Sequence, residues 1–124
     1  MNIHKSAEDY LEMILMLSEE KGYVRSIDIA AGLNVTKPSV SYAMKQLREN
    51  GYITMDQDNY ISLTEDGLSI AQKMFKRHKA ITSFLIQIGV DEDIAREDAC
   101  KIEHVISDKS FETLKKHMEQ QQKK

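Results

Sequence analysis

The sequence predicts a mainly α-helical protein: an N-terminal winged helix-turn-helix with a two-stranded wing, followed by a helical domain. Three observations predict this fold. Apolar residues recur at helical spacing through the first half of the chain, with turn signals between the runs. Two short strand-like runs with a polar turn between them follow directly. Helical spacing then returns and continues to the polar C-terminal tail.

Composition limits the class of protein. The chain has 124 residues, of which 41% are hydrophobic and 30% charged, a balance typical of one or two small folded domains. Apolar runs stay well short of the roughly 20 residues that cross a bilayer, and the first residues lack the apolar core of a signal peptide. The single cysteine, Cys100, excludes an internal disulfide framework and fits a reducing compartment. We therefore expect a cytoplasmic protein.

Two helices are predicted first. Ser6, followed by two acids, is expected to cap a helix that ends at Lys21-Gly22. A short second helix is expected to begin at Ser26. A tight turn at Gly32-Leu33-Asn34 should end it and leave Val35 as an apolar plug in the core.

A third helix follows and leads into the wing. Thr36 is its predicted N-cap, Pro38 lies in its first turn, and it should end near Glu49. Residues 52–55 and 60–63 are the predicted strands of a hairpin. The predicted buried face of the helix consists of Val40, Met44 and Leu47, spaced by four and three residues.

The C-terminal half is predicted to be helical. A long helix capped by Thr64 should run to about Ile88, where Gly89-Val90 ends it. A further helix is expected over 91–107, and a last one from 108 into a fraying tail at 120–124. The corresponding domains are predicted to be residues 1–72 and 73–124; their roles in DNA binding, and in metal binding and dimerisation, rest on the motifs and the resemblance described below.

A helix, a turn, a second helix and a hairpin form a winged helix-turn-helix, whose second helix enters the major groove of operator DNA. Hydroxyl and lysine side chains on its outer face suit phosphates and base edges. The segment from Arg25 to Tyr52 carries four basic and two acidic residues, a balance of only +2 within a chain of net charge −3, so phosphate neutralisation should contribute modestly. A winged helix that contacts protein instead remains an alternative. The predicted DNA contacts are Arg25, Ser26, Thr36, Lys37, Pro38, Ser39, Ser41, Tyr42 and Lys45.

Three separated helices carry candidate ligands for a first-row divalent ion. Spacing alone leaves the site open, because each residue has an ordinary explanation. Asp9 suits the start of a helix, Cys100 a small buried position, and His78 an exposed basic run. The candidate metal ligands are Asp9, Glu12, His78, Cys100, Glu103 and His104.

Seven segments in order carry a family resemblance: Glu8-Asp9-Tyr10-Leu11-Glu12, Gly22 to Ala30, Lys37-Pro38-Ser39-Val40-Ser41, Leu63-Thr64-Glu65-Asp66-Gly67, Arg77-His78, Ile88-Gly89-Val90-Asp91-Glu92, and Cys100 to Ser107. In them the chain resembles, over residues 6–107, the metal-dependent repressors typified by the diphtheria toxin repressor and the manganese transport regulator. The resemblance implies a homodimer that binds metal through the six candidate ligands and represses metal-uptake genes.

The expected ligand set is a hybrid of two types within that family. Manganese-type members have a carboxylate at the place of Cys100, whereas iron-type members have cysteine there. Iron-type members tend to have methionine at the place of Asp9, where this chain has the aspartate of the manganese type. Thr82 and Arg96 stand where iron-type members have ligands of an ancillary site, which puts that site in doubt. The expected ion is Fe²⁺ or Mn²⁺, with the thiolate favouring Fe²⁺.

Two other interpretations are kept. The stripe Ile81, Phe84, Leu85 and Ile88 is expected either in the dimer interface or in the core. The function itself has an alternative, a metal-independent winged-helix regulator that responds to an organic ligand or a protein partner. An enzyme, such as a hydrolase with Glu103 as base, is not expected, because the sequence contains no nucleophile elbow, phosphate loop or zinc-protease motif.

Overall fold

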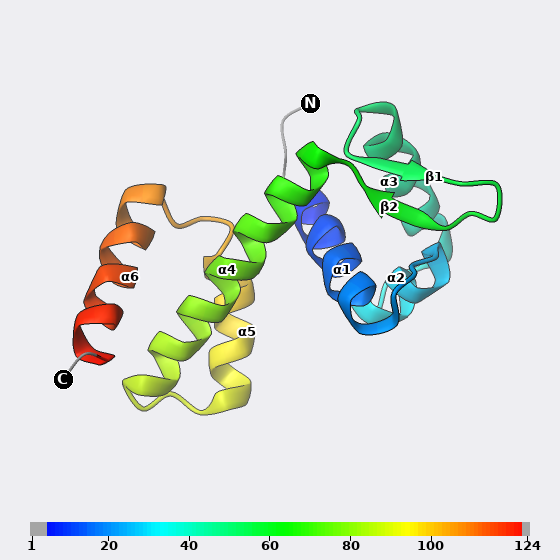
Figure 1. The fold of residues 1–124 in the computed structure, drawn as a ribbon. Coiled ribbons are helices and arrows are strands. Elements are labelled where there is room, and N and C mark those ends of the chain that lie inside the picture. Colours follow the sequence, from blue (N-terminus) through cyan, green and yellow to red (C-terminus); the bar gives the residue numbers. More distant parts are fainter. Residues whose placement is uncertain (1–4, 123–124) are drawn as a thin grey trace. The chain divides into compact units, whose positions relative to one another are not determined.

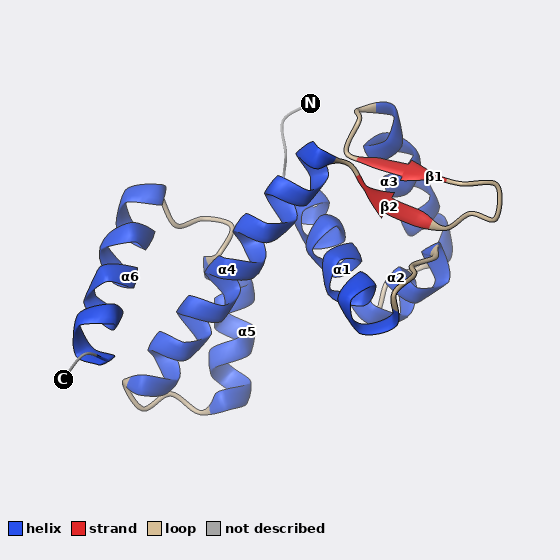
Figure 2. Cartoon of the chain, viewed as in Figure 1, coloured by secondary structure: helices blue, strands red, loops and turns tan. Residues whose placement is uncertain are grey.

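A computed structural model describes residues 5–122 and divides the chain into two compact units, Met1–Lys73 and Met74–Lys124. Three helices and an antiparallel hairpin precede a long helix that begins in the first unit and continues in the second (Figures 1 and 2). Two shorter helices follow. The elements are α1 (Lys5–Lys21), α2 (Ser26–Leu33), α3 (Lys37–Glu49), β1 (Ile53–Met55), β2 (Ile61–Leu63), α4 (Glu65–Gln87), α5 (Glu92–Ile102) and α6 (Asp108–Gln122).

The core of the first unit comes from every one of its elements. Helix α1 contacts α2, α3 and β2, and α3 contacts β1, so the hairpin closes one side of the helical bundle. The predicted buried face of α3 is confirmed. Helix α1 already includes Ser6, so the prediction that Ser6 caps this helix is wrong. Side chains no more than 3% exposed in this core are Leu11, Ile14, Val24, Ile29, Val40, Met44, Leu47, Ile53, Ile61 and Ala71.

The turn between α2 and α3 is shorter than expected. Gly32 and Leu33 still belong to α2, and Asn34 alone takes the left-handed conformation (φ 55°) that turns the chain. Val35 is 38% exposed and therefore not a core plug, which corrects the sequence prediction. Thr36 does cap α3 as predicted, since its Oγ1 accepts a hydrogen bond from the Ser39 amide at 3.3 Å.

Asp28 stabilises the start of α2. Its carboxylate accepts a hydrogen bond from the backbone N–H of Arg25 at 3.0 Å and lies 3.1 Å from Lys21 Nζ. The backbone hydrogen bond from Arg25, followed by the bond from Lys21, holds the pKa of Asp28 below its ordinary value. The folded pKa is thus lower than the unfolded one. The carboxylate stabilises the fold above the unfolded pKa, and this contribution disappears as the pH falls through the folded pKa.

We therefore expect Asp28→Asn to lower the free energy of unfolding of the first unit by about 1 kcal/mol at pH 7. The difference from the wild type should close as the pH falls below the ordinary carboxyl pKa of about 3.9. Urea denaturation at a series of pH values measures both, with Asp58→Asn in the wing as the control. A difference that stays constant down to pH 2.5 would rule out this role of the charge.

The hairpin forms the predicted wing. Strands β1 and β2 pair antiparallel, with Thr54 opposite Ser62, and the Ile61 amide also donates to the Val24 carbonyl at 2.8 Å. Asp56 organises the tip, because its Oδ1 accepts the amides of Asp58 and Tyr60 at 2.9 Å each. One acid of the wing thus has a structural role.

Helix α4 begins against the backbone of the segment that enters β1. Thr64 caps it, as predicted, by accepting the Gly67 amide at 3.2 Å. The Thr64 amide in turn donates to the Tyr52 carbonyl at 3.1 Å. A Cβ atom at Gly67 would lie 2.0 Å from that same carbonyl oxygen, so only glycine fits.

The second unit has its own small core. Ile81, Ala99 and Phe111, from three different helices, form its centre, and Ala80, Leu85, Ile102 and Ile106 pack against them. Ile81 is 1% exposed, so this residue belongs to the core of its own unit. Of the predicted interface stripe, only Ile88, at 63%, is largely exposed.

Helix α5 is shorter than predicted. It ends at Ile102, with Glu103 as its C-cap, and turns occupy residues 103–105. Glu103 and His104 therefore lie in the connection to α6 and not within a helix reaching 107. Helix α6 continues to Gln122, and the last two residues of the predicted fraying tail fall outside the described part of the chain.

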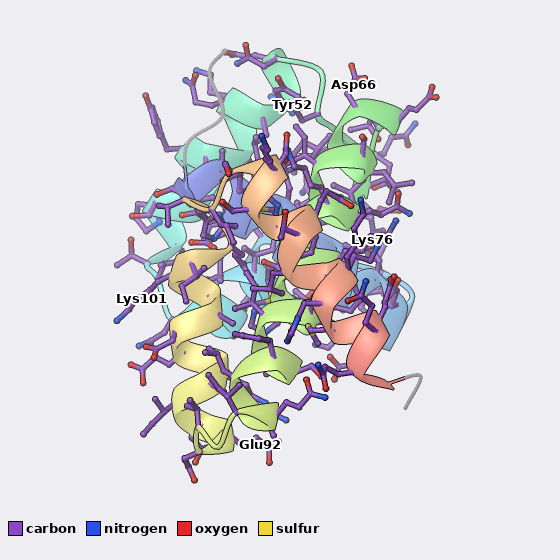
Figure 3. All side chains as sticks on the ribbon, turned by 90° about the vertical axis from the view of Figure 1, so that its left-hand side faces the viewer. Tyr52, Asp66, Lys76, Glu92 and Lys101 are labelled. Carbon is purple, nitrogen blue, oxygen red and sulfur yellow. The ribbon has the colours of Figure 1, made fainter. Side chains whose placement is uncertain are left out.

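Charged side chains cover the outside of both units. Asp66, Lys76, Glu92 and Lys101 are exposed and point away from their helices (Figure 3). None of the helices described between residues 5 and 122 is long and apolar enough to cross a membrane.

Candidate functional site

The outer face of α3 is built as a DNA-reading surface requires. Val40, Met44 and Leu47 fix one face of the helix in the core, which leaves the opposite face open to a major groove. Tyr42 is 68% exposed. The predicted contact residues of this segment, Thr36, Lys37, Pro38, Ser39, Ser41, Tyr42 and Lys45, are all exposed.

Two of the predicted hydroxyl contacts are coupled to each other. Thr36 Oγ1 donates to Ser39 Oγ at 2.8 Å while accepting the Ser39 amide. The Ser39 hydroxyl can therefore still donate its own hydrogen to another acceptor. A phosphate oxygen is one such acceptor.

Arg25 is held at the base of the wing. Its guanidinium carbon lies 4.3 Å from the centre of the Tyr60 ring, and the Tyr23 ring packs edge-on against Tyr60 with centroids 5.7 Å apart. Arg25 is exposed and the adjacent Ser26 is half-buried. The sequence analysis did not predict that Tyr23 and Tyr60 would pack beside the predicted DNA contact Arg25.

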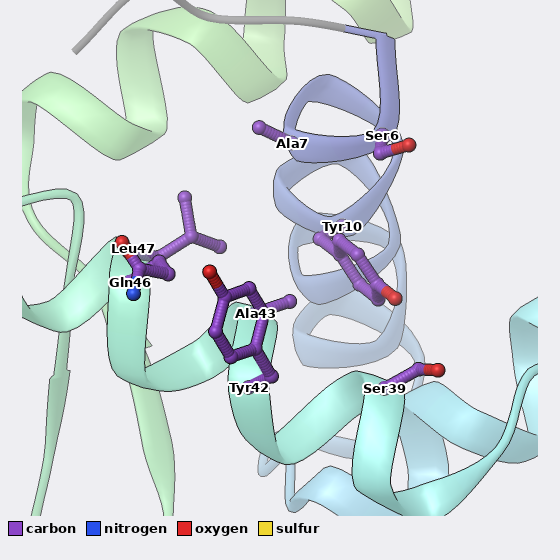
Figure 4. A pocket seen from close by; sticks show the side chains of 8 residues that line it. All are labelled: Ser6, Ala7, Tyr10, Ser39, Tyr42, Ala43, Gln46 and Leu47. Atoms are coloured by element: carbon purple, nitrogen blue, oxygen red, sulfur yellow. The ribbon is translucent and has the colours of Figure 1, made fainter.

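A pocket of about 340 Å³ lies between α1 and α3 (Figure 4). Sequence reasoning did not find it, because it combines two helices. Its signal on α3 is the spacing of Ser39, Tyr42 and Gln46, which brings one flank of that helix to the pocket. The lining residues are Ser6, Ala7, Tyr10, Ser39, Tyr42, Ala43, Gln46 and Leu47.

Four of the six predicted metal ligands belong to the second unit, and three of them surround the fourth, Glu103. Glu103 Oε2 lies 2.9 Å from His78 Nδ1, and Oε1 lies 3.3 Å from His104 Nε2. A carboxylate oxygen of Glu103 is within 4.8 Å of the Cys100 Sγ atom. The structure thus brings His78 of α4 together with Cys100 of α5 and with Glu103 and His104 of the turn that follows α5.

The donor set of this cluster fits a divalent cation. Glu103 is fully buried, and within residues 5–122 its Oε1 has no hydrogen-bond partner. A buried carboxylate oxygen without a hydrogen bond is costly unless a cation or a proton compensates its charge. Imidazole nitrogen, thiolate sulfur and carboxylate oxygen are together the ligands of first-row transition metals.

The other two predicted ligands lie on α1 of the first unit. Asp9 and Glu12 are three residues apart, so their carboxylates share one face of that helix. Asp9 is half-buried and Glu12 is 7% exposed.

The ancillary metal site of iron-type family members, which would include positions 82 and 96, has few potential ligands in this chain. Thr82 and Arg96 line a pocket with His78, Lys79, Ser83 and Ile86, and none of these supplies a carboxylate. Arg96 is itself paired with Glu92 at 2.5 Å. This environment fits the departure noted in the sequence, where Thr82 and Arg96 replace ancillary ligands.

Arg77 anchors the turn that carries Glu103 and His104. Its guanidinium, in a side chain 6% exposed, donates to the Glu103 carbonyl at 3.0 Å and to the Ile106 carbonyl at 2.8 Å. It also pairs with the Asp108 carboxylate at the start of α6. Sequence reasoning missed this role, because Arg77 stands in a run of basic residues that is typical of an exposed surface.

Comparisons with known proteins agree with both halves of this description. Residues 2–60 match the family described as the N-terminal DNA binding domain of the iron dependent repressor. Residues 64–124 match the metal binding and dimerisation domain of the same repressor.

Similar curated proteins are transcriptional regulators. An uncharacterised HTH-type regulator of Methanocaldococcus jannaschii is 39% identical over 93% of this chain and 94% of its own length. The transcriptional regulator MntR of Escherichia coli O6:H1 is 36% identical over 87% of this chain and 70% of its own length. The HTH-type regulator MntR of Bacillus subtilis is 38% identical over 88% and 77%.

Solved structures show the same fold. The manganese regulator SloR superposes with a TM-score of 0.82 and 31% identity over 96% of this chain. A manganese-dependent transcriptional repressor in complex with manganese gives 0.78 and 27% over 87%. The chain spans 55% and 50% of those two longer chains. By its sequence, fold and two matched domains, the chain belongs to the iron-dependent repressor family of metal-dependent, DNA-binding transcriptional regulators.

Proposed function

We propose that this chain is a transcriptional repressor that binds operator DNA as a homodimer when Fe²⁺ or Mn²⁺ occupies a site centred on Glu103. The observation that carries the proposal is the buried Glu103 carboxylate. It lies between His78 and His104, and its Oε1 has no hydrogen bond within the described residues. We propose as its targets the genes of metal uptake and homeostasis.

The proposed ligands are Asp9, Glu12, His78, Cys100, Glu103 and His104. A bound divalent ion supplies positive charge and accepts lone pairs from oxygen, nitrogen and sulfur. His78 holds one oxygen of the Glu103 carboxylate at 2.9 Å, and a bound ion that also took Asp9 and Glu12 as ligands would couple the DNA-binding unit to the metal. Without compensation these carboxylates repel each other, which would loosen that connection.

The choice of ion depends on opposing ligands. The Cys100 thiolate is softer than a carboxylate and favours Fe²⁺ and later metals, whereas Asp9 and Glu12 favour Mn²⁺. The names of the relatives point to manganese for those proteins. We retain Fe²⁺ as the preferred ion of this chain because of Cys100, with Mn²⁺ as a second activating ion.

DNA recognition would use the outer face of α3 with Arg25 and Ser26 beside it. A dimer places two recognition helices at half-sites about one helical turn of DNA apart, or a multiple of it. Ile88 and the partly buried Phe84 are the members of the predicted stripe that a partner subunit could cover.

The test measures DNA affinity against metal. Fluorescence anisotropy under anaerobic conditions would compare chelator with titrated Fe²⁺, Mn²⁺ and Zn²⁺, on a duplex selected from a random library and on a scrambled duplex. We expect Fe²⁺ and Mn²⁺ to raise the affinity for the selected duplex about 5- to 150-fold. Sedimentation at micromolar concentration should show a dimer. Equal binding in chelator and in metal would contradict the proposal and favour the metal-independent regulator.

A further inference from the structure

Two tyrosines and one arginine form a cluster where the loop before α2 meets the base of the wing. The centre of the Tyr60 ring lies 4.3 Å from the Arg25 guanidinium carbon. The Tyr23 ring packs against Tyr60 with an angle of 73° between the ring planes, the edge-to-face geometry that aromatic pairs prefer. Tyr23 is 55% exposed and Arg25 is exposed, so this Arg25 cluster lies at the surface of the first unit.

Hydrogen bonds fix the backbone on both sides of the Arg25 cluster. The amide of the residue after Tyr60 donates to the carbonyl of the residue before Arg25 at 2.8 Å. The Arg25 amide donates to the Asp28 carboxylate at 3.0 Å, and the Tyr60 amide donates to Asp56 Oδ1 at 2.9 Å. Because the main chain is anchored in this way, the freedom that remains to Arg25 is that of its side chain, and the Tyr60 ring restricts it.

The charge of Arg25 is available to a phosphate. Its guanidinium forms no ion pair within residues 5–122, and the nearby Asp28 carboxylate pairs with Lys21 at 3.1 Å. The face of an aromatic ring attracts a guanidinium without supplying an oxygen acceptor, so the N–H donors of Arg25 can still bond to phosphate oxygens. Arg25 directly precedes α2, the first helix of the motif, which crosses the DNA backbone in a helix-turn-helix.

We propose that Tyr60, supported by Tyr23, is a positioning residue for DNA binding, which holds the Arg25 guanidinium in the conformation that contacts a phosphate of the operator. This role rests on the proposed function, in which Arg25 contacts DNA, and it adds two residues that do not themselves touch the duplex. A long side chain loses rotamer freedom when it binds, and a ring that restricts it beforehand lowers that cost. The ordering of Arg25 matters because the segment from Arg25 to Tyr52 has a balance of only +2.

The experiment separates the position of the guanidinium from its charge. Tyr60→Leu removes the ring, Tyr60→Phe removes only its hydroxyl, and Arg25→Gln removes the cation. The double variant that combines Tyr60→Leu with Arg25→Gln completes a mutant cycle. Ser62→Ala, at an exposed position of β2, is the matched control in the wing. Anisotropy with saturating Mn²⁺ would give Kd at several KCl concentrations on the selected and the scrambled duplex, and the melting temperature of each variant would confirm folding.

We expect Tyr60→Leu to weaken binding about 2- to 10-fold, equally on both duplexes, because a phosphate contact carries no sequence information. The slope of log affinity against log salt should match that of the wild type, since Arg25 still reaches its phosphate in the complex. Arg25→Gln should reduce this slope by about one, and Tyr60→Leu should then cause no further loss. Tyr60→Phe and Ser62→Ala should bind as the wild type does.

A measurement without DNA tests the positioning by itself. NMR relaxation of the Arg25 Nε–H group should give a higher order parameter in the wild type and in Tyr60→Phe than in Tyr60→Leu. Tyr23→Leu, at an exposed position, is a second variant that leaves the wing unchanged. It should lower the order parameter of Arg25 and weaken DNA binding in the same direction as Tyr60→Leu, again only when Arg25 is present.

Equal order parameters of Arg25 in the wild type and in both leucine variants would overturn the positioning role. A loss caused by Tyr60→Leu that persists in the Arg25→Gln background would also overturn it, because Tyr60 would then contact DNA directly. Wild-type DNA affinity in both leucine variants would refute this inference and leave the proposed function intact. A wild type that binds neither duplex with any metal would refute the proposed function and, with it, this inference.

Discussion

Replacing Glu103 with glutamine is expected to abolish the stimulation of DNA binding by metal. The substitution keeps the shape of the side chain and removes the charge that lies between His78 Nδ1 and His104 Nε2. A neutral amide is a poor ligand for Fe²⁺ or Mn²⁺ in this set, so metal affinity should fall by at least about 100-fold. The gain in DNA affinity on adding metal, about 5- to 150-fold in the wild type, should then be absent.

The fold of the variant should survive, which separates this result from general damage. A buried carboxylate without a hydrogen bond on one oxygen is itself costly, so its neutralisation should leave the metal-free protein as stable as before or more so. Glu97→Gln, at an exposed position of α5, is the matched control and should retain full stimulation. Metal titration by calorimetry and anisotropy on the selected duplex provide the two readouts. Full metal-dependent binding by Glu103→Gln would show that the site is wrongly placed.

Replacing Gly67 with alanine is expected to give the largest loss of stability in the first unit. The new Cβ would lie 2.0 Å from the Tyr52 carbonyl oxygen and 3.0 Å from its carbonyl carbon. That carbonyl cannot easily withdraw, because it accepts the Thr64 amide while the Tyr52 amide donates to Leu47 at 2.9 Å. Overpacking of this kind costs about 3 kcal/mol at the upper end of the usual range.

Urea denaturation followed by circular dichroism measures the effect of Gly67→Ala. Ser69→Ala, at an exposed position two residues further along α4, is the control and should lie within about 0.5 kcal/mol of the wild type. A Gly67→Ala protein with wild-type stability would mean that α4 can move away from the hairpin without cost. The DNA affinity of the variant should fall in proportion to the unfolded fraction.

Local signals in the sequence predicted the parts of the fold that depend on neighbouring residues. The spacing of Val40, Met44 and Leu47 identified the buried face of α3, and the Thr36 and Thr64 caps were correctly placed. These features follow from helix periodicity and from capping chemistry, which act within a few positions. The outward DNA-reading face then follows as the opposite side of the helix.

The errors arose where distant segments decide the outcome. Val35 is apolar and follows a turn, but the direction in which the chain leaves Asn34 keeps it at the surface. Arg77 stands in a basic run, yet its guanidinium is buried because it donates to the carbonyls of Glu103 and Ile106, 26 and 29 residues away. The end of α5 was misplaced for a related reason. A turn replaces the last residues predicted for α5, and Arg77 binds the carbonyls of that turn.

The candidate ligands show the same division. Spacing placed Cys100, Glu103 and His104 near one another. Their contact with His78, 25 residues before Glu103, could be inferred only from the family resemblance or from the structure. The pocket between α1 and α3 had a sequence signal on one of its two helices only, the spacing of Ser39, Tyr42 and Gln46. Both features join residues from two helices, and single-helix periodicity does not report how two helices pack.

Two consecutive residues of α4 make hydrogen bonds to Glu103. Arg77 donates to its main-chain carbonyl, and His78 bonds to its carboxylate. The placement of this carboxylate is therefore established by the protein itself, and an arriving ion need not organise the turn. Preorganisation of this kind lowers the entropic cost of capture. In the proposed metal site it also separates two properties: a different side chain at position 100 would change which ion is preferred, while the scaffold that presents Glu103 would stay the same.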